Sequence, residues 1–381
     1  MNQLPYTDEH NAFRRRLRDF LESEVIPHVD RWETDHRIPR DIWRKMGREG
    51  FLCTAVPREY GGLGGDFLYS VIVNEEMVRT NHTGLMAQLH SDVVVPYIDT
   101  FGSAAQKEKY LPGCVSGDIV TAVAMTEPDA GSDLASMTST AVEEGGQVVL
   151  NGAKTFISNG IHCDLVVLAA RNPNVANPHN AISLYLVEDG TAGFKKGQRI
   201  EKMGMRSQDT AELFFTNCRI PAENLLGEKG GGFIQLMQKL QQERLVVAIW
   251  SMAIAKYMMS WTRDFCRRNS RGGELLAASQ AIQFALVEME TDLRVGTAFL
   301  NDLIMAHNRR EAVVVETSMA KFWMSQKANQ IANRCLEVVG DVAAREECPL
   351  VRMWRDVRIQ TIFAGTNEIM KGIVAKSMNL Q

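Results

Sequence analysis

The feature of this sequence that most constrains its fold is a change of hydrophobic period, which occurs twice along the chain. Before about residue 118 and after about residue 229, apolar residues recur every three to four positions, the period of one helix face. Between these points the apolar residues form short β-branched runs separated by turn residues, which is typical of strands. At 381 residues the chain also exceeds the ~250–300 residues that one core supports, so we expect several domains.

Both ends of the chain carry the helical period. Phe13, Leu17, Phe20 and Leu21 fall on one helix face, and Thr7 supplies an oxygen that can cap the first turn. The same spacing returns in two later runs, which predict long helices with short connections, as in a four-helix bundle. These runs contain Phe233, Leu236, Met237, Leu240, Ile282, Leu286, Met289 and Leu293.

The central part reads as a β domain. Short apolar runs at residues 148–150, 165–168, 182–187 and 213–215 predict strands, and Glu-Gly-Gly at 144–146 predicts a hairpin turn. Several short strands at this spacing predict a small barrel or a sandwich. We therefore expect a mainly α chain with a central β domain. The expected domains are an N-terminal helical bundle at residues 1–118, a small β-barrel at 119–228 and a C-terminal four-helix bundle at 229–381.

Composition excludes several classes of function. The net charge of −4 argues against a nucleic-acid surface. The longest apolar run, at residues 245–254, is too short to span a bilayer and predicts a buried helix instead. The first residues lack a basic segment followed by an apolar one, so no secretory signal is expected. Seven cysteines without a Cys-x-x-Cys pair and scattered histidines predict reduced thiols, no metal site and a cytoplasmic location.

The string Met-Thr-Glu-Pro-Asp-Ala-Gly-Ser-Asp at residues 125–133 follows a strand-like apolar run. Pro128 fixes one backbone angle, and Gly131 permits a positive φ or a close backbone approach. A turn with free N–H groups at the end of a buried strand suits a polar ring system or a phosphate, although an ordinary loop would fit the bare pattern. A second glycine-rich loop, at 59–66, lacks both a preceding strand and a following Gly-Lys-Ser/Thr, so we predict a plain turn there.

Four further strings follow in a fixed order, at residues 154–160, 202–215, 240–245 and 362–370. Together with the turn at 125–133, their order and spacing resemble the acyl-CoA dehydrogenase family, with most similarity to its long-chain and isovaleryl branches. The resemblance implies a flavoprotein of fatty acid β-oxidation, in which a carboxylate removes the α-proton of an acyl-CoA and FAD accepts the β-hydride, giving trans-2-enoyl-CoA. It also implies a helical, β, helical architecture, a tetramer, and an electron-transferring flavoprotein as electron acceptor. Acyl-CoA oxidases, which pass electrons to oxygen, are usually longer chains.

The resemblance also selects a catalytic base. In the medium-chain branch the base directly precedes Gly-Thr in the last string, where this chain has Ala364, which cannot accept a proton. The long-chain and isovaleryl branches place the base on a helix in a Gln-Glu-Arg or Leu-Glu-Arg string, and the match here is Glu243. Taken alone, Glu243 would be a surface carboxylate beside Arg244. The resemblance further implies that the Ala364 backbone N–H binds the thioester oxygen.

Other roles follow by position in the matched strings. For Phe156 and Gln280 the residues alone favour a core and a solvated position, respectively. The substrate-binding residues that the resemblance implies are Ser132, Arg244 and Gly365. Those implied for FAD are Val123, Met125, Thr126, Gly131, Ser132, Phe156, Ile157, Ser158, Gln280, Gly340, Thr366 and Glu368.

Two strings that normally reach the FAD of a neighbouring subunit depart from the family pattern. An Arg-x-x-Phe-Gly string is replaced around Asn269 and Gly272, where Arg268 or Arg271 offers a substitute. A Gln-x-x-Gly-Gly string is replaced by one that begins with Glu337 and ends with Asp341, an acid that would repel a diphosphate. The chain is then either a homotetramer with rearranged FAD contacts or part of a hetero-oligomer with a paralogous chain. A catalytically weak or non-catalytic subunit is the alternative function, and the length, branching or ring of the acyl group stays open.

Overall fold

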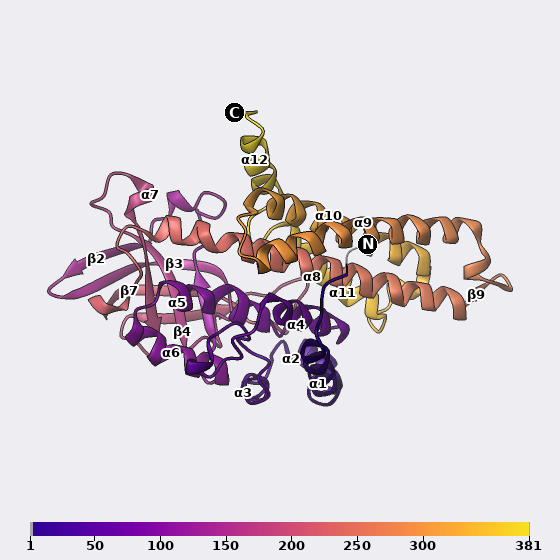
Figure 1. The fold of residues 1–381 in the computed structure, drawn as a ribbon, viewed down its shortest axis with the longest axis horizontal. Helices are drawn as coiled ribbons and strands as arrows, with labels where there is room; N and C mark the ends of the chain where they lie inside the picture. The colour runs from indigo at the N-terminus through magenta and orange to yellow at the C-terminus, as the bar shows by residue number, and fades with distance from the viewer. Residues whose placement is uncertain (1–2, 381) are drawn as a thin grey trace.

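The computed structural model describes residues 3–380, and its elements fall into N-terminal helices, a central sheet and long C-terminal helices (Figure 1). Helix α1 (Asp8–Glu24) begins as the sequence predicts: the Thr7 Oγ1 accepts a hydrogen bond from the His10 N–H, and Phe13 and Leu17 are buried. The other N-terminal helices are α2 (Val29–Asp35), α3 (Asp41–Arg48), α4 (Phe67–Arg79), the π-helix η3 (Leu89–Val94), α5 (Val95–Phe101) and α6 (Ala104–Ser116).

The glycine-rich loop at residues 59–66 is a turn, as predicted. Gly61 and Gly64 have φ values of 89° and 61°, which glycine adopts without strain. The loop ends at Asp66, whose side chain accepts a hydrogen bond from the Leu68 N–H and so caps α4. The glycines therefore shape the entry to a helix.

The central domain contains one eight-stranded sheet, in the order β6-β7-β3-β2-β4-β5-β8, with β1 parallel to β4. All four predicted strands are confirmed, within β3, β4, β5 and β7. The end strands β6 and β8 do not pair with each other among the described residues, so the closed barrel is not confirmed. Alternating side chains indicate a buried strand face but do not determine whether the sheet edges meet. The strands are β1 (Thr121–Ala124), β2 (Thr140–Glu144), β3 (Gln147–Ser158), β4 (Leu165–Arg171), β5 (Ile182–Glu188), β6 (Phe194–Arg199), β7 (Thr210–Pro221) and β8 (Leu225–Leu226).

The predicted hairpin joins β2 to β3. Glu144 pairs with Gln147 across the turn, and Gly145 and Gly146 both have positive φ, at 58° and 81°. Positive φ at both central residues gives the tight turn that matches the twist of antiparallel strands. The hairpin prediction is therefore confirmed.

The region predicted as a four-helix bundle contains three long helices and two shorter ones within the described residues. The long helices pack against one another, and the short α12 extends away from the body of the molecule and ends near the C-terminus (Figure 1). A short hairpin of β9 (Ser270–Arg271) and β10 (Glu274–Leu275) lies at the opposite end of the bundle from the sheet (Figure 1). The helices are α8 (Gly232–Arg268), α9 (Gln280–Asn308), α10 (Val314–Val339), α11 (Pro349–Val357) and α12 (Asn367–Ser377).

Helix α8 is long and apolar enough, by length and composition, to cross a membrane, which the short run at residues 245–254 did not indicate. However, 78% of its most apolar window is buried inside the protein, where it contacts α4, α9 and α10. It is thus the central helix of a core, and the predicted burial of residues 245–254 is confirmed. All seven cysteines are buried and free, and the cytoplasmic location stays a prediction.

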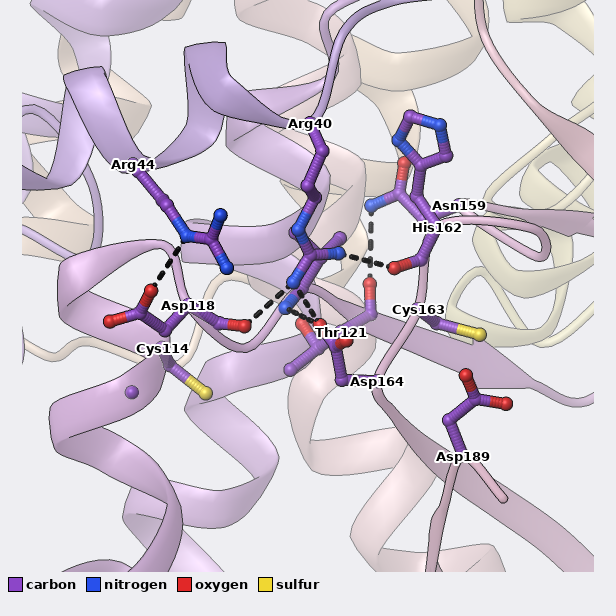
Figure 2. A network of polar contacts seen from close by, with 12 residues as sticks. Arg40, Arg44, Cys114, Asp118, Thr121, Asn159, His162, Cys163, Asp164 and Asp189 are labelled. Atoms are coloured by element: carbon purple, nitrogen blue, oxygen red, sulfur yellow. Dashed lines mark hydrogen bonds and ion pairs between the residues drawn. The ribbon is translucent and has the colours of Figure 1, made fainter.

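Arg40, which precedes α3, connects the N-terminal helices to the sheet through hydrogen bonds and an ion pair (Figure 2). Its guanidinium donates to the backbone oxygens of His162, at 2.5 Å, and Asp118, at 2.6 Å, and pairs with the Asp164 carboxylate. Asp164 also accepts from the Val120 N–H at 2.7 Å, immediately before β1. The surface hollow of about 810 Å³ beside this network is lined by many charges that pair with one another, which makes it a structural junction.

Candidate active site

A cavity of about 450 Å³ lies where the three parts of the chain meet, and its lining is largely apolar. A volume of this size with a few converging polar groups is typical of a small-molecule site. Twelve of the residues predicted for catalysis, substrate or cofactor line it. They are Val123, Met125, Thr126, Gly131, Ser132, Phe156, Ile157, Ser158, Glu243, Arg244, Ala364 and Gly365.

The turn after β1 forms one wall. The Glu127 N–H donates to the Ala130 oxygen at 2.8 Å, closing a tight turn around Pro128. Gly131 has no positive φ, contrary to one of the two expectations for it. A Cβ built there would meet only the Thr126 methyl group, at 3.9 Å, so the space beside Gly131 is open to a ligand.

A buried ion pair supports this turn from below. The Lys154 Nζ lies 2.9 Å from the Glu127 carboxylate and donates to the Met125 oxygen at 3.0 Å, and both side chains are buried. Glu127 also accepts from the N–H groups of Thr138 and Ser139. Burial alone would raise the pKa of Glu127, but the Lys154 charge and these donors bring it to about 2. The turn is therefore held from within by a carboxylate that stays ionised.

Phe156 enters the site through an irregularity in β3. The pairing of β3 with β7 shifts between Lys154 and Ile157, and Phe156 has a φ of 57°, which is rare for an aromatic residue. Phe156 is 65% exposed to solvent although it lines the cavity. The expectation from the residue alone, a core position, is wrong, because the bulge turns the ring out of the sheet core.

Glu243 lies on α8 in the cavity wall and is 5% exposed. The Tyr97 hydroxyl, which is fully buried on α5, donates to the Glu243 Oε1 at 2.8 Å. Burial raises the pKa of Glu243 to about 7, although the Tyr97 hydrogen bond and the charge of Arg244 oppose the rise. A carboxyl held in this way can exchange a proton near neutral pH, which is what a general base requires. The interpretation of Glu243 as a surface carboxylate is thus wrong.

Two other buried side chains bring unpaired polar atoms to the cavity. Arg244 is 4% exposed and donates to the Ser318 Oγ at 3.3 Å, but its Nε lacks a partner. Gln88, directly before the π-helix, is 3% exposed, and its Oε1 also lacks a partner. Buried polar atoms without partners are uncommon in native proteins. Their presence in one cavity indicates that a ligand with polar groups completes it.

The turn before α12 forms the opposite wall. Ala364 and Gly365 have φ values of 52° and 91°, so two successive residues adopt the left-handed region. The Gly365 carbonyl accepts a hydrogen bond from the Lys321 Nζ at 2.6 Å. Lys321 is a fully buried lysine on α10. The backbone at Ala364 is therefore held in an uncommon conformation beside the cavity.

Four predicted cofactor residues do not line this cavity. The Thr366 Oγ1 accepts from the Ile369 N–H and caps α12, and Glu368 is exposed in the first turn of that helix. Gln280 begins α9, and Gly340 directly follows α10 as its C-terminal cap. A Cβ built on Gly340 would meet the Arg271 Nη2 at 2.6 Å, so the Arg271 guanidinium lies directly against Gly340. The four residues thus lie in two places outside the cavity: Thr366 and Glu368 at the start of α12, and Gln280 and Gly340 at the start of α9 and the end of α10.

Sequence patterns did not identify Tyr97, Gln88, Lys321 or the Lys154–Glu127 pair. Tyr97 and Glu243 are 146 positions apart, and no local spacing connects them. The only signal in the sequence was that Glu127 and Lys154 each lie inside a matched string, at residues 125–133 and 154–160. Among residues 3–380, no group of three histidine, cysteine or acidic side chains is placed to hold a metal ion.

The fold and the cavity define a class of three-part enzyme in which a buried carboxyl group lines an apolar cavity between the helical parts and the sheet. Family profiles described as the acyl-CoA dehydrogenase N-terminal, middle and C-terminal domains match residues 7–118, 122–218 and 230–379. The chain belongs to the acyl-CoA dehydrogenase family, whose members are FAD flavoproteins, and it catalyses the dehydrogenation of an acyl-CoA.

Named relatives agree with this assignment. The chain is 40% identical to the long-chain specific acyl-CoA dehydrogenase of Rattus norvegicus, over 98% of this chain and 87% of that protein. A crystal structure of an acyl-CoA dehydrogenase from Geobacillus kaustophilus is 46% identical, with a TM-score of 0.97 over 99% of this chain and 100% of that one. A structure titled as the electron transferring flavoprotein of Acidaminococcus fermentans contains a chain that is 30% identical, with a TM-score of 0.94 and 99% of each chain covered.

Proposed function

We propose that this protein converts an acyl-CoA to its trans-2-enoyl-CoA with Glu243 as the base that removes the α-proton. The observation that carries the proposal is the Glu243 carboxyl, buried in the cavity wall, with its pKa raised by burial to about 7. Perturbed carboxyls of this kind concentrate at catalytic sites. Ala364 cannot take this role, because it has no proton-accepting group.

The residues of the cavity fit FAD. The turn at residues 125–133 offers backbone groups, Phe156 offers a ring turned out of the sheet, and unpaired polar atoms remain on Gln88 and Arg244. Thr126, Ser132 and Ser158 would hold the flavin, with Phe156 against its ring system. When bound, FAD supplies an acceptor for the hydride that leaves Cβ.

The protein's own groups then act on the thioester. Glu243 removes the α-proton. The Tyr97 hydroxyl keeps the Glu243 carboxylate oriented through its hydrogen bond to the Oε1. The Ala364 N–H donates to the thioester oxygen, where negative charge develops as the proton leaves. Donors fixed in place before reaction stabilise such charge at no cost of rearrangement. Apolar side chains such as Leu240 and Val247 exclude water from the acyl chain.

The raised pKa gives a predicted pH profile. Only the ionised carboxylate accepts a proton, so kcat/KM for an acyl-CoA should fall about tenfold for each pH unit below about 7 and level off above it. Flavin content at each pH serves as the control for unfolding. A profile that stays flat through the range from about pH 5.5 to 8 would contradict Glu243 as the base.

The acyl group is identified by a direct assay of the product. Straight-chain, branched and alicyclic acyl-CoA thioesters are incubated with the protein and an artificial electron acceptor, and a product lighter by two hydrogens is sought by mass spectrometry. The apolar lining supports an extended or branched hydrocarbon chain. Failure of every thioester to lose two hydrogens would overturn the proposed reaction.

We also propose that the chain assembles as a homotetramer in which Arg271 replaces the family's missing arginine. Arg271 lies against Gly340 at an exposed end of the bundle, close to the sequence that ends in Asp341. Helix α9 exposes Phe284, Val287 and Val295, at 59%, 63% and 56%, and exposed apolar side chains on one helix favour a partner.

The assembly is tested on the chain expressed alone. We expect a mass of four copies and about one flavin per chain, and Arg271→Ala should lower flavin content while preserving the mass. A native monomer without flavin would instead favour the hetero-oligomer. Arg267→Ala, an exposed arginine on the neighbouring end of α8, is the matched control.

The electron acceptor is proposed as an electron-transferring flavoprotein, on the family resemblance. Reduction of such a flavoprotein in the presence of acyl-CoA is compared with oxygen consumption under the same conditions. Faster consumption of oxygen would favour an oxidase instead.

A further inference from the structure

Lys321 is a buried lysine whose charge has no obvious structural use. It lies on α10 with none of its surface exposed, and its Nζ donates to the Gly365 carbonyl at 2.6 Å and the Asn367 Oδ1 at 3.2 Å. Both acceptors are neutral oxygens. Burial, together with the nearby charge of Arg244, lowers the pKa of Lys321 to about 7, against the pull of Glu368. Burying an ammonium group on neutral partners costs stability, and no ion pair among the described residues offsets this cost.

The groups around Lys321 form one clamp on the turn before α12. Ser325, one turn further along α10, also donates to the Asn367 Oδ1, at 3.1 Å. The Asn367 Nδ2 in turn donates to the Phe322 oxygen at 3.2 Å. Three residues of one helix thus hold the two ends of a turn that begins at Gly365. The residue before it, Ala364, has a φ of 52°, a conformation that persists only when its surroundings enforce it.

We propose that Lys321 is a positioning residue for the dehydrogenation: by fixing the Gly365 carbonyl and Asn367, it holds the Ala364 N–H toward the thioester oxygen, and its charge favours the enolate that forms there. This inference rests on the proposed function of Ala364. Lys321 does not touch the substrate; it acts through the backbone. A donor aimed before reaction at the place where charge develops contributes far more than a mobile one.

The test uses an acyl-CoA analogue with sulfur in place of Cβ. This 3-thia-acyl-CoA can lose its α-proton but has no β-hydride to transfer, so its ionisation on the protein is read from the long-wavelength absorbance beside bound flavin. In Lys321→Met, the apparent pKa of the bound analogue should rise by about one unit, a tenfold weaker enolate stabilisation, with flavin content unchanged. Lys321→Gln keeps a shorter neutral donor and should show a smaller rise.

A second readout needs no flavin. In the flavin-free protein, hydrogen exchange of the amides at residues 363–367 should be about tenfold faster in Lys321→Met than in the native chain. Lys327→Met is the matched control and should change neither quantity. It removes a partly exposed lysine of α10 that pairs with Asp292 of α9.

The outcomes separate this inference from the proposed function. If the native protein does not ionise the analogue, the proposed function itself fails. If the native protein ionises it and the folded Met variant does so with the same pKa, Lys321 has no positioning role. If the Met variant does not fold, Lys321→Gln decides: an unchanged pKa of the bound analogue in that variant overturns the inference.

Discussion

Glu243→Gln is expected to lower the turnover of an acyl-CoA by roughly 10²–10⁴-fold while the protein keeps its bound flavin. The amide has nearly the shape of the carboxyl and still accepts the hydrogen bond from the Tyr97 hydroxyl. It has no basic oxygen, so the α-proton stays on the substrate. The measurement is steady-state turnover at about pH 8, where the native carboxylate is ionised.

The same variant should fold at least as well as the native chain at that pH. An ionised carboxylate in a site this buried is costly, and the neutral amide removes the cost. Asp264→Asn, at the distal end of the same helix and half exposed, is the matched control and should retain native turnover. Loss of turnover together with loss of flavin would show damage to the site rather than loss of a base.

Lys154→Met is expected to destabilise the protein by about 3–5 kcal/mol and to release flavin, because it leaves the Glu127 carboxylate buried without its cation. The Met125 oxygen loses a donor in the same change, so the turn at residues 125–133 loosens where the flavin would lie. The free energy of unfolding and the flavin content per chain are measured together.

A double variant tests whether the unpaired Glu127 carboxylate causes the loss of stability. Lys154→Met with Glu127→Gln removes both charges, and it should be more stable than Lys154→Met alone because no unpaired charge remains buried. Lys195→Met, an exposed lysine in β6 of the same sheet, is the control and should leave stability within about 0.5 kcal/mol. Equal stability of the single and double variants would contradict a role for the ion pair.

Much of the fold follows from the sequence because it depends on local periodicity. Phe13 and Leu17 mark a helix face, and Gly145 and Gly146 mark a hairpin, without reference to distant residues. The closed barrel is not confirmed, because closure would require pairing of the end strands β6 and β8, and these do not pair within residues 3–380. Strand patterns specify faces, whereas closure depends on tertiary geometry.

The candidate site likewise contains some residues that the sequence could predict and others that it could not. The residues that line the cavity through matched strings, such as Glu243 and Ala364, could be named from the sequence. The partners of these residues could not be named from the sequence. Tyr97 and Lys321 come from other helices, and only tertiary packing brings them beside Glu243 and the turn at Gly365. The raised pKa of Glu243 likewise arises mainly from burial, which no local string records. The residue Phe156 taken alone favoured a core position, because a single bulge in β3 is not visible in the pattern, whereas the matched string placed it at the cofactor.

The central claim is that the Glu243 carboxylate removes the α-proton, and an anaerobic half-reaction tests it most directly. Native protein and Glu243→Gln, each with bound flavin, are mixed with excess acyl-CoA in the absence of any other electron acceptor. The account predicts that the flavin absorbance of the native protein bleaches, more slowly when the α-hydrogens are replaced by deuterium, and that the variant stays yellow. Bleaching of the variant at the native rate would contradict it.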